Sequence, residues 1–84
     1  MEQVIAYNCN RFGVTYISRS GLEYLTELSL HLREDEMRFV DAAVQAASVT
    51  RSFVEDSTFR GRPIITEKDV ERVLEFYKEL RYRR

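Results

Sequence analysis

The chain has 84 residues, enough for one domain with a modest core and too few for two. Hydrophobic residues make up 44% of it and charged residues 32%, a balance typical of a globular protein and not of a disordered tail. No apolar run approaches the length of a membrane span, and the first residues lack the basic and apolar segments of a secretory signal. We therefore expect a cytoplasmic protein with no membrane partner.

Reactive and metal-binding side chains are scarce. Cys9 is the only cysteine and His31 the only histidine, which argues against an internal disulfide, a metal site and acid-base catalysis. We predict no catalytic residue and no metal ligand. The formal net charge is −1, but residues 1–57 carry five basic and nine acidic residues, whereas residues 58–84 carry eight and five. The C-terminal third is therefore the basic part of the chain.

The first helix is predicted over residues 2–12. Apolar side chains recur there at helical spacing, and Gly13 follows where a left-handed residue often ends a helix. Residues 14–17 are β-branched or aromatic. We interpret them as an extended connector, because the pattern offers no second strand with which they would pair.

A second helix is predicted over residues 19–32, and either Ser18 or Ser20 suits its N-cap. One face of this helix carries four leucines, Leu22, Leu25, Leu28 and Leu32. Acidic residues at 34–36 favour the start of a third helix, predicted over residues 36–56. That helix is rich in alanine and has two adjacent apolar stripes, so we expect it to be the central element that its neighbours approach closely.

Residues 55–63 contain a glycine and a proline and predict a turn. A fourth helix is predicted over residues 67–81, with Thr66 as its cap and Asp69 three residues later. Every element except the short connector is assigned as helix. The sequence therefore predicts that residues 1–84 form a single all-α domain, a four-helix bundle.

Four short motifs follow one another in an order that is found in a known family of helical domains. They are Phe12-Gly13-Val14 with Tyr16-Ile17-Ser18, then Leu22-Glu23-Tyr24-Leu25, then Met37-Arg38-Phe39, and finally Gly61-Arg62-Pro63-Ile64-Ile65-Thr66-Glu67-Lys68-Asp69-Val70. By these motifs nearly the whole chain resembles the C-terminal lid domain of AAA+ ATPases. It is similar to the lids of RuvB-like helicases, origin-recognition proteins, MoxR-type and Lon-type ATPases, and the motifs do not favour one subfamily. The linker at residues 55–60 is longer than in most lids.

The resemblance implies a lid that packs over the nucleotide of an AAA+ core domain and couples ATP hydrolysis to movement against neighbouring subunits. The chain has no Gly-Lys-Ser/Thr loop, so we expect ATP to be bound only through the parent protein. The resemblance also makes nucleic acid a possible ligand through the parent. Arg38 matches the sensor 2 arginine, which faces the phosphates at the start of the third lid helix and suits them because its guanidinium is a rigid donor. The alternative for Arg38 is a surface ion pair with Glu34 or Asp35.

Two other functional classes fit the same sequence. A long central helix, a basic turn and a Thr-capped helix with Asp-Val also resemble the histone fold, which implies a dimer that binds DNA. The acidic balance of residues 1–57 argues against the DNA binding. The third class is a small adaptor that binds a partner helix in an apolar groove.

Two groups of side chains bear on these alternatives. Basic residues near the C-terminus are either phosphate contacts or solvated helix ends; they are Arg60, Arg62, Lys78, Arg81, Arg83 and Arg84. Four phenylalanines, at positions 39, 53, 59 and 76, exceed what one narrow core stripe can hide. We expect one or two of them on a surface that docks against another domain or subunit, and the others in the core.

Overall fold

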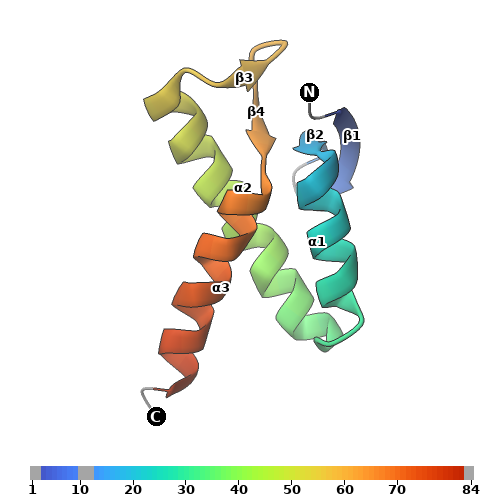
Figure 1. Cartoon of the computed structure of the whole chain (residues 1–84), viewed down its shortest axis with the longest axis vertical. Helices are drawn as coiled ribbons and strands as arrows, with labels where there is room; N and C mark the ends of the chain where they lie inside the picture. The colour runs from blue at the N-terminus through green and yellow to red at the C-terminus, as the bar shows by residue number, and fades with distance from the viewer. Residues whose placement is uncertain (1–2, 10–12, 83–84) are drawn as a thin grey trace.

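The structure, a computed structural model, describes residues 3–9 and 13–82. In chain order its elements are β1 (Val4–Cys9), β2 (Gly13–Ser18), α1 (Arg19–Ser29), α2 (Glu34–Glu55), β3 (Thr58–Phe59), β4 (Arg62–Ile65) and α3 (Glu67–Tyr82). Figure 1 shows the strands gathered at one end, with α1 and α3 running away from them and the long α2 running obliquely from the far end of α1 past α3. The prediction of an all-α four-helix bundle is therefore wrong, because the described residues combine three helices with a sheet.

The four strands form one mixed sheet in the order β1-β2-β4-β3. β1 and β2 are antiparallel, with Ile5 opposite Ile17, whereas β2 and β4 run parallel, with Ile17 beside Ile65. Residues 14–17, interpreted from the sequence as a connector, are thus part of a central strand with a partner on each side. One partner, β1, lies in the segment predicted to be a helix, and the other, Ile64 and Ile65 of β4, lies between the predicted turn at residues 55–63 and the last predicted helix.

The first predicted helix, over residues 2–12, is corrected to the strand β1; residues 2 and 10–12 lie outside the described part of the chain. Ile5 and Tyr7 pack against the core while Ala6 between them is exposed, which is the period-two pattern of a strand. The Tyr7 hydroxyl donates to Asp41 Oδ1 in α2 at 2.7 Å. Over so few residues the apolar pattern does not separate a helix from a strand. The β-branched and aromatic side chains favour a strand once a neighbouring strand is present.

The other three predicted helices are present with shifted ends. α1 begins at residue 19 as predicted but ends earlier, at Ser29, while α2 and α3 match residues 36–56 and 67–81 to within two residues. Ser18 is the N-cap of α1, since its Oγ accepts a hydrogen bond from the Gly21 backbone N–H at 3.2 Å. The strand β3 and the first two residues of β4 lie in the segment 55–63 that the sequence predicts to be a turn. Gly61 between the two strands has a φ of 76°.

The core lies between the sheet and the inner sides of the three helices. Its buried apolar residues are Ile17, Leu25, Val40, Val44, Ile65, Val70 and Val73. The central strand pair contributes Ile17 and Ile65, both fully buried, so the parallel pairing of β2 and β4 brings the starts of α1 and α3 together over α2. Among the described residues, no helix combines the length and the apolar character that crossing a membrane requires.

We expect Leu25→Ala to lower the free energy of unfolding by about 2 to 4 kcal/mol, because it leaves a cavity at a side chain that is only 4% exposed. Leu30→Ala is the matched control; Leu30 is 78% exposed, and its loss should change stability by less than about 0.5 kcal/mol. Urea unfolding followed by circular dichroism measures both. Equal midpoints for the two variants would show that the inner side of α1 is misassigned.

Candidate interaction surface

The helix α2 carries apolar residues on two opposite faces. Its inner face includes Val40 and Val44, both fully buried in the core. Its opposite face carries Phe39, Ala42, Ala46, Val49 and Phe53, which we call the outer stripe. The exposed fractions of Phe39, Val49 and Phe53 are 45%, 42% and 76%. Within the described chain this second face is only partly covered: Phe39 contacts Tyr77 of α3, whereas Phe53 is mostly exposed.

The outer stripe is also free of charge. Between Asp41 and Glu55 the only charged residue is Arg51, whose side chain points to the inner side, toward α3. The inner face of α2 also carries polar residues, among them the buried Ser48 and Ser52, so the helix is not apolar all round. The outer stripe is an exposed apolar surface of the kind that marks interaction sites.

The positions of the phenylalanines correct part of the sequence analysis. Phe39, Phe53 and Phe76 are all exposed, more than the one or two expected on a docking surface. Phe59 is half-buried and packs edge-on against Tyr16, with ring centroids 4.9 Å apart. Val54, near the end of α2, is 81% exposed. The sequence predicted two adjacent apolar stripes on this helix, whereas the structure buries Val40 and Val44 on one face and leaves Phe53 exposed on the opposite face.

A groove with a volume of about 300 Å³ lies beside the outer stripe, between α2 and the strands β2 and β4. Its walls include Ala42, Gln45 and Val49 from the helix and Thr15 and Pro63 from the strands. Gln45 is 7% exposed, and its side-chain Nε2 has no hydrogen-bond partner in the described part of the chain. A buried donor without an acceptor costs about 1 to 3 kcal/mol. The groove is thus lined by apolar and polar residues together, among them the charged Arg62, and it contains one unsatisfied polar group.

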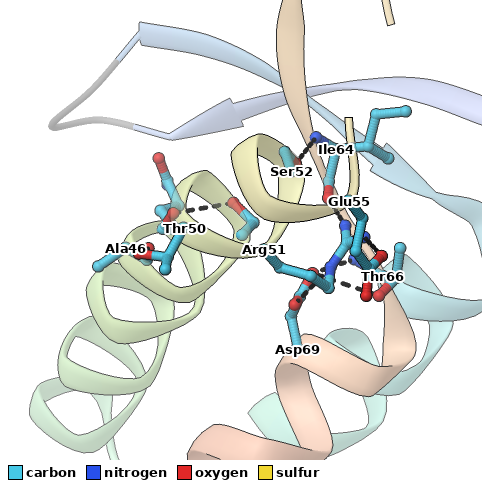
Figure 2. Close-up of polar contacts among 10 residues, drawn as sticks. Ala46, Thr50, Arg51, Ser52, Glu55, Ile64, Thr66 and Asp69 are labelled. Carbon is cyan, nitrogen blue, oxygen red and sulfur yellow. Dashed lines mark hydrogen bonds and ion pairs between the residues drawn. The ribbon is translucent and has the colours of Figure 1, made fainter. Parts of the chain in front are cut away.

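A network of polar contacts fixes the end of α2 to the start of α3. Arg51 Nε donates to Asp69 Oδ1 at 2.9 Å, and its Nη2 donates to the Ile64 carbonyl oxygen at 2.6 Å. Figure 2 shows these groups converging from α2, β4 and α3. The other carboxylate oxygen of Asp69 accepts from the Thr66 N–H at 2.9 Å. We call Arg51, Ile64, Thr66 and Asp69 the polar clasp.

The polar clasp is largely shielded from water, since the Arg51 side chain is 14% exposed and that of Asp69 is 3% exposed. Burial alone lowers the pKa of Arg51, but its hydrogen bonds to Asp69 and Glu55 raise it more, and the net pKa lies above the usual arginine value. Arg51 therefore stays charged. Ser52, one residue later, accepts a hydrogen bond from the Ile64 N–H at 3.3 Å and so also holds β4 against α2.

The sequence analysis named Thr66 and Asp69 as a cap but missed Arg51. The available signal was a single charged residue inside an apolar helical run, a position where an unpaired charge is costly. Such a residue implies a buried partner without saying which one. Asp69 lies 18 residues further along the chain, so the pairing depended on the fold.

Arg38, the predicted phosphate-sensing residue, lies in the first turns of α2. Its Nη2 donates to Glu34 Oε1 at 2.9 Å, and its side chain is 78% exposed. The structure thus contains the ion pair that was the alternative interpretation, while the phosphate-sensing role stays a prediction. His31 is exposed, and Cys9 lies where no side chain is described.

The basic residues whose side chains the structure describes do not form one continuous group; Arg83 and Arg84 lie outside the described residues. Arg60 and Arg62 lie in the β3–β4 turn, whereas Lys78 lies near the end of α3, and Figure 1 shows these two places at opposite ends of the molecule. Tyr77, which the sequence interleaves with them, donates its hydroxyl to Glu36 at 2.6 Å. Within residues 3–9 and 13–82, no cluster of three or more histidine, cysteine or acidic side chains is placed to hold a metal ion.

Comparisons with protein-family models, with curated proteins and with solved structures find no match to this chain. The function is therefore argued from the geometry alone.

We expect Asp69→Ala to lower the free energy of unfolding by about 3 kcal/mol, because it leaves the Arg51 guanidinium largely buried without its main partner. The double variant Arg51→Met with Asp69→Leu removes both charges and should recover much of this loss. Glu55→Gln is the control. Since Glu55 is 58% exposed, breaking its contact to Arg51 should cost less than about 1 kcal/mol. Chemical denaturation measures all three, and similar losses in the first and last variants would contradict the role of the clasp.

We expect Arg38→Ala to change the melting temperature little, because an exposed pair spaced by four residues contributes only about 0.3 to 0.5 kcal/mol. Differential scanning calorimetry measures this. A loss as large as that of a core variant would show that Arg38 supports the fold and would remove it as a free nucleotide contact.

Proposed function

We propose that this chain is a non-catalytic pairing module that forms a homodimer through the outer stripe of α2. The observation that carries the proposal is the second apolar face of that helix, which carries no charged residue and stays largely exposed within the described chain. Single exposed apolar residues are ordinary on protein surfaces, but a continuous stripe on a central helix is typical of an interface.

The accessible surface of the chain is large enough to include the interface of a homodimer. It amounts to 6400 Å² for a mass of 10.0 kDa, whereas a compact monomer of this mass exposes only about 5,200 Å². The excess of roughly 1,200 Å² is what one subunit buries in a stable homodimer. The extents of 41 × 25 × 25 Å agree with this, because the molecule is elongated and not closed around its core.

The order of side chains along the outer stripe favours a second copy as the occupant. Large residues stand at both ends, Phe39 and Phe53, each seven positions from Ala46. Two such helices crossing antiparallel at Ala46 place Phe39 of one copy against Phe53 of the other, twice, as a two-fold axis requires. The small alanines at the centre permit close approach. Phe39 already contacts Tyr77 at 5.6 Å between ring centroids, so Phe53 of the second copy meets an aromatic pair.

This dimer agrees with one of the classes considered from the sequence. The histone-fold interpretation implies a short helix, a long helix and a third helix, with two copies paired through the middle of the long helix. The separation of the two basic groups gives no support to its DNA-binding part, which is left out of the proposal. In the AAA+ lid interpretation the same stripe is covered by the nucleotide-binding core of a longer protein. That core is the competing occupant.

We expect Ala46→Glu to raise the dimer dissociation constant at least about 100-fold, because it places two carboxylates opposite each other at the centre of an apolar interface. Thr26→Glu is the matched control, since Thr26 is also an exposed helical residue but lies on α1. Size-exclusion chromatography with light scattering over a dilution series measures the dissociation constants.

Circular dichroism of Ala46→Glu should show an intact monomer, because Ala46 is exposed in the single chain. If the unsubstituted chain is a monomer at every concentration, or if both variants dimerise equally well, the outer stripe does not pair with itself. Binding by a separately supplied AAA+ core domain in place of self-association would favour the competing occupant.

A further inference from the structure

We infer that Gln45 pairs with Gln45 of the second copy across the two-fold axis, each side-chain amide donating to the carbonyl oxygen of the other. This inference rests on the proposed function, because it needs a second copy on the outer stripe. Its own support is the unpartnered Nε2 of a side chain that is only 7% exposed and that forms part of the wall of the groove beside the stripe.

The position of Gln45 makes the pairing geometrically direct. In an antiparallel helix pair related by a two-fold axis, a residue level with the axis meets its own copy, whereas a residue one turn away meets a different one. Gln45 is next to Ala46, the centre of the outer stripe, and lies on the side of the groove. Both copies of Gln45 therefore fall on the same side of the interface, at nearly the same level.

The chemistry of the side chain fits a self-pair. A primary amide carries both a donor and an acceptor, so two copies satisfy each other with two hydrogen bonds. In the single chain Nε2 finds no acceptor among the described residues, and the neighbouring Ser48 hydroxyl donates to the Gln45 backbone carbonyl at 2.8 Å. Because Nε2 is shielded by the chain's own atoms, the amide must turn outward through the groove of about 300 Å³ to reach the second copy. Dimerisation thereby gives a partner to a group that the isolated chain leaves unpaired.

The consequence is a fixed register. One polar pair inside an apolar interface opposes any shift by a helical turn, since the shifted amides would face alanine or valine and lose their partners. The same pair disfavours a purely apolar helix as a partner. Gln45 is thus the residue that makes the outer stripe specific for a second copy of this chain.

A crosslinking experiment tests the contact in the full chain with Cys9→Ser, which removes the only native thiol. Gln45→Cys should be linked into a dimer by a short bis-maleimide reagent, because the two copies are offset by only about 3 Å along the helix axis, while packed helices lie about 8 to 10 Å apart, beyond the reach of a direct disulfide. Ala42→Cys lines the same groove and is the matched control. Its two copies lie about 12 Å apart along the axis, so it should crosslink much more slowly with the same reagent.

A charge exchange provides the second readout. Gln45→Glu and Gln45→Lys should each self-associate at least about tenfold more weakly than the native chain, and their mixture should form the heterodimer, because opposite charges then meet at the axis. Native mass spectrometry counts the three species once the Gln45→Lys chain is labelled with nitrogen-15, because the two substitutions alone give nearly equal masses. If the native chain dimerises but Gln45→Cys and Ala42→Cys crosslink equally, or the mixture shows no preference, the amide pair is wrong and the dimer stands. If the native chain is a monomer, both proposals fail.

Discussion

The structure depends on a constraint in α2: a helix of 22 residues that has apolar residues on opposite faces and a single charged residue between Asp41 and Glu55. Its inner face organises the fold, since the sheet, α1 and α3 all pack against it. Its outer face stays largely exposed. Because exposing a whole apolar face of a central helix is unfavourable, the same feature that builds the core also implies a second molecule or domain.

The polar clasp explains how one side of α2 can be filled by a short chain. Arg51 reaches from α2 to the Ile64 carbonyl and the Asp69 carboxylate, and so sets the exit of β4 and the start of α3 in one place. The Asp69 carboxylate also accepts a hydrogen bond from the Thr66 N–H at the start of α3. The pairing of Ile17 with Ile65 fixes the other side of this junction. These contacts leave α3 on the inner side of α2, and the outer stripe therefore stays open.

The sequence predicted the helices far better than the sheet, for physical reasons. The helical period persists over many residues in α2 and α3, and local signals such as Thr66 with Asp69 mark a helix start. In contrast, the strands β1, β2 and β4 are short; β1 and β2 are consecutive, but β4, the other partner of β2, lies far along the chain. Ile17 is a strand residue because Ile5 and Ile65 lie beside it, and no local pattern contains that information. The same limit applies to Arg51, whose partner Asp69 is recognisable only once α3 folds back.

The candidate surface was predicted in part. The surplus of phenylalanines indicated a docking surface, but the two stripes of α2 looked equivalent until the structure showed that Val40 and Val44 are buried and Phe53 is not. Gln45 looked unremarkable in the sequence, because an unpaired amide is visible only when burial and hydrogen bonds are known. The AAA+ lid and histone-fold resemblances share the central helix, and they differ in what covers its outer face.

Sedimentation equilibrium of the unsubstituted chain at micromolar concentration tests the central claim most directly, because it reports the mass in solution without a label or a substitution. The account predicts a species of twice 10.0 kDa that dissociates on dilution. A single species of 10.0 kDa at all concentrations, with the chain folded, would contradict it.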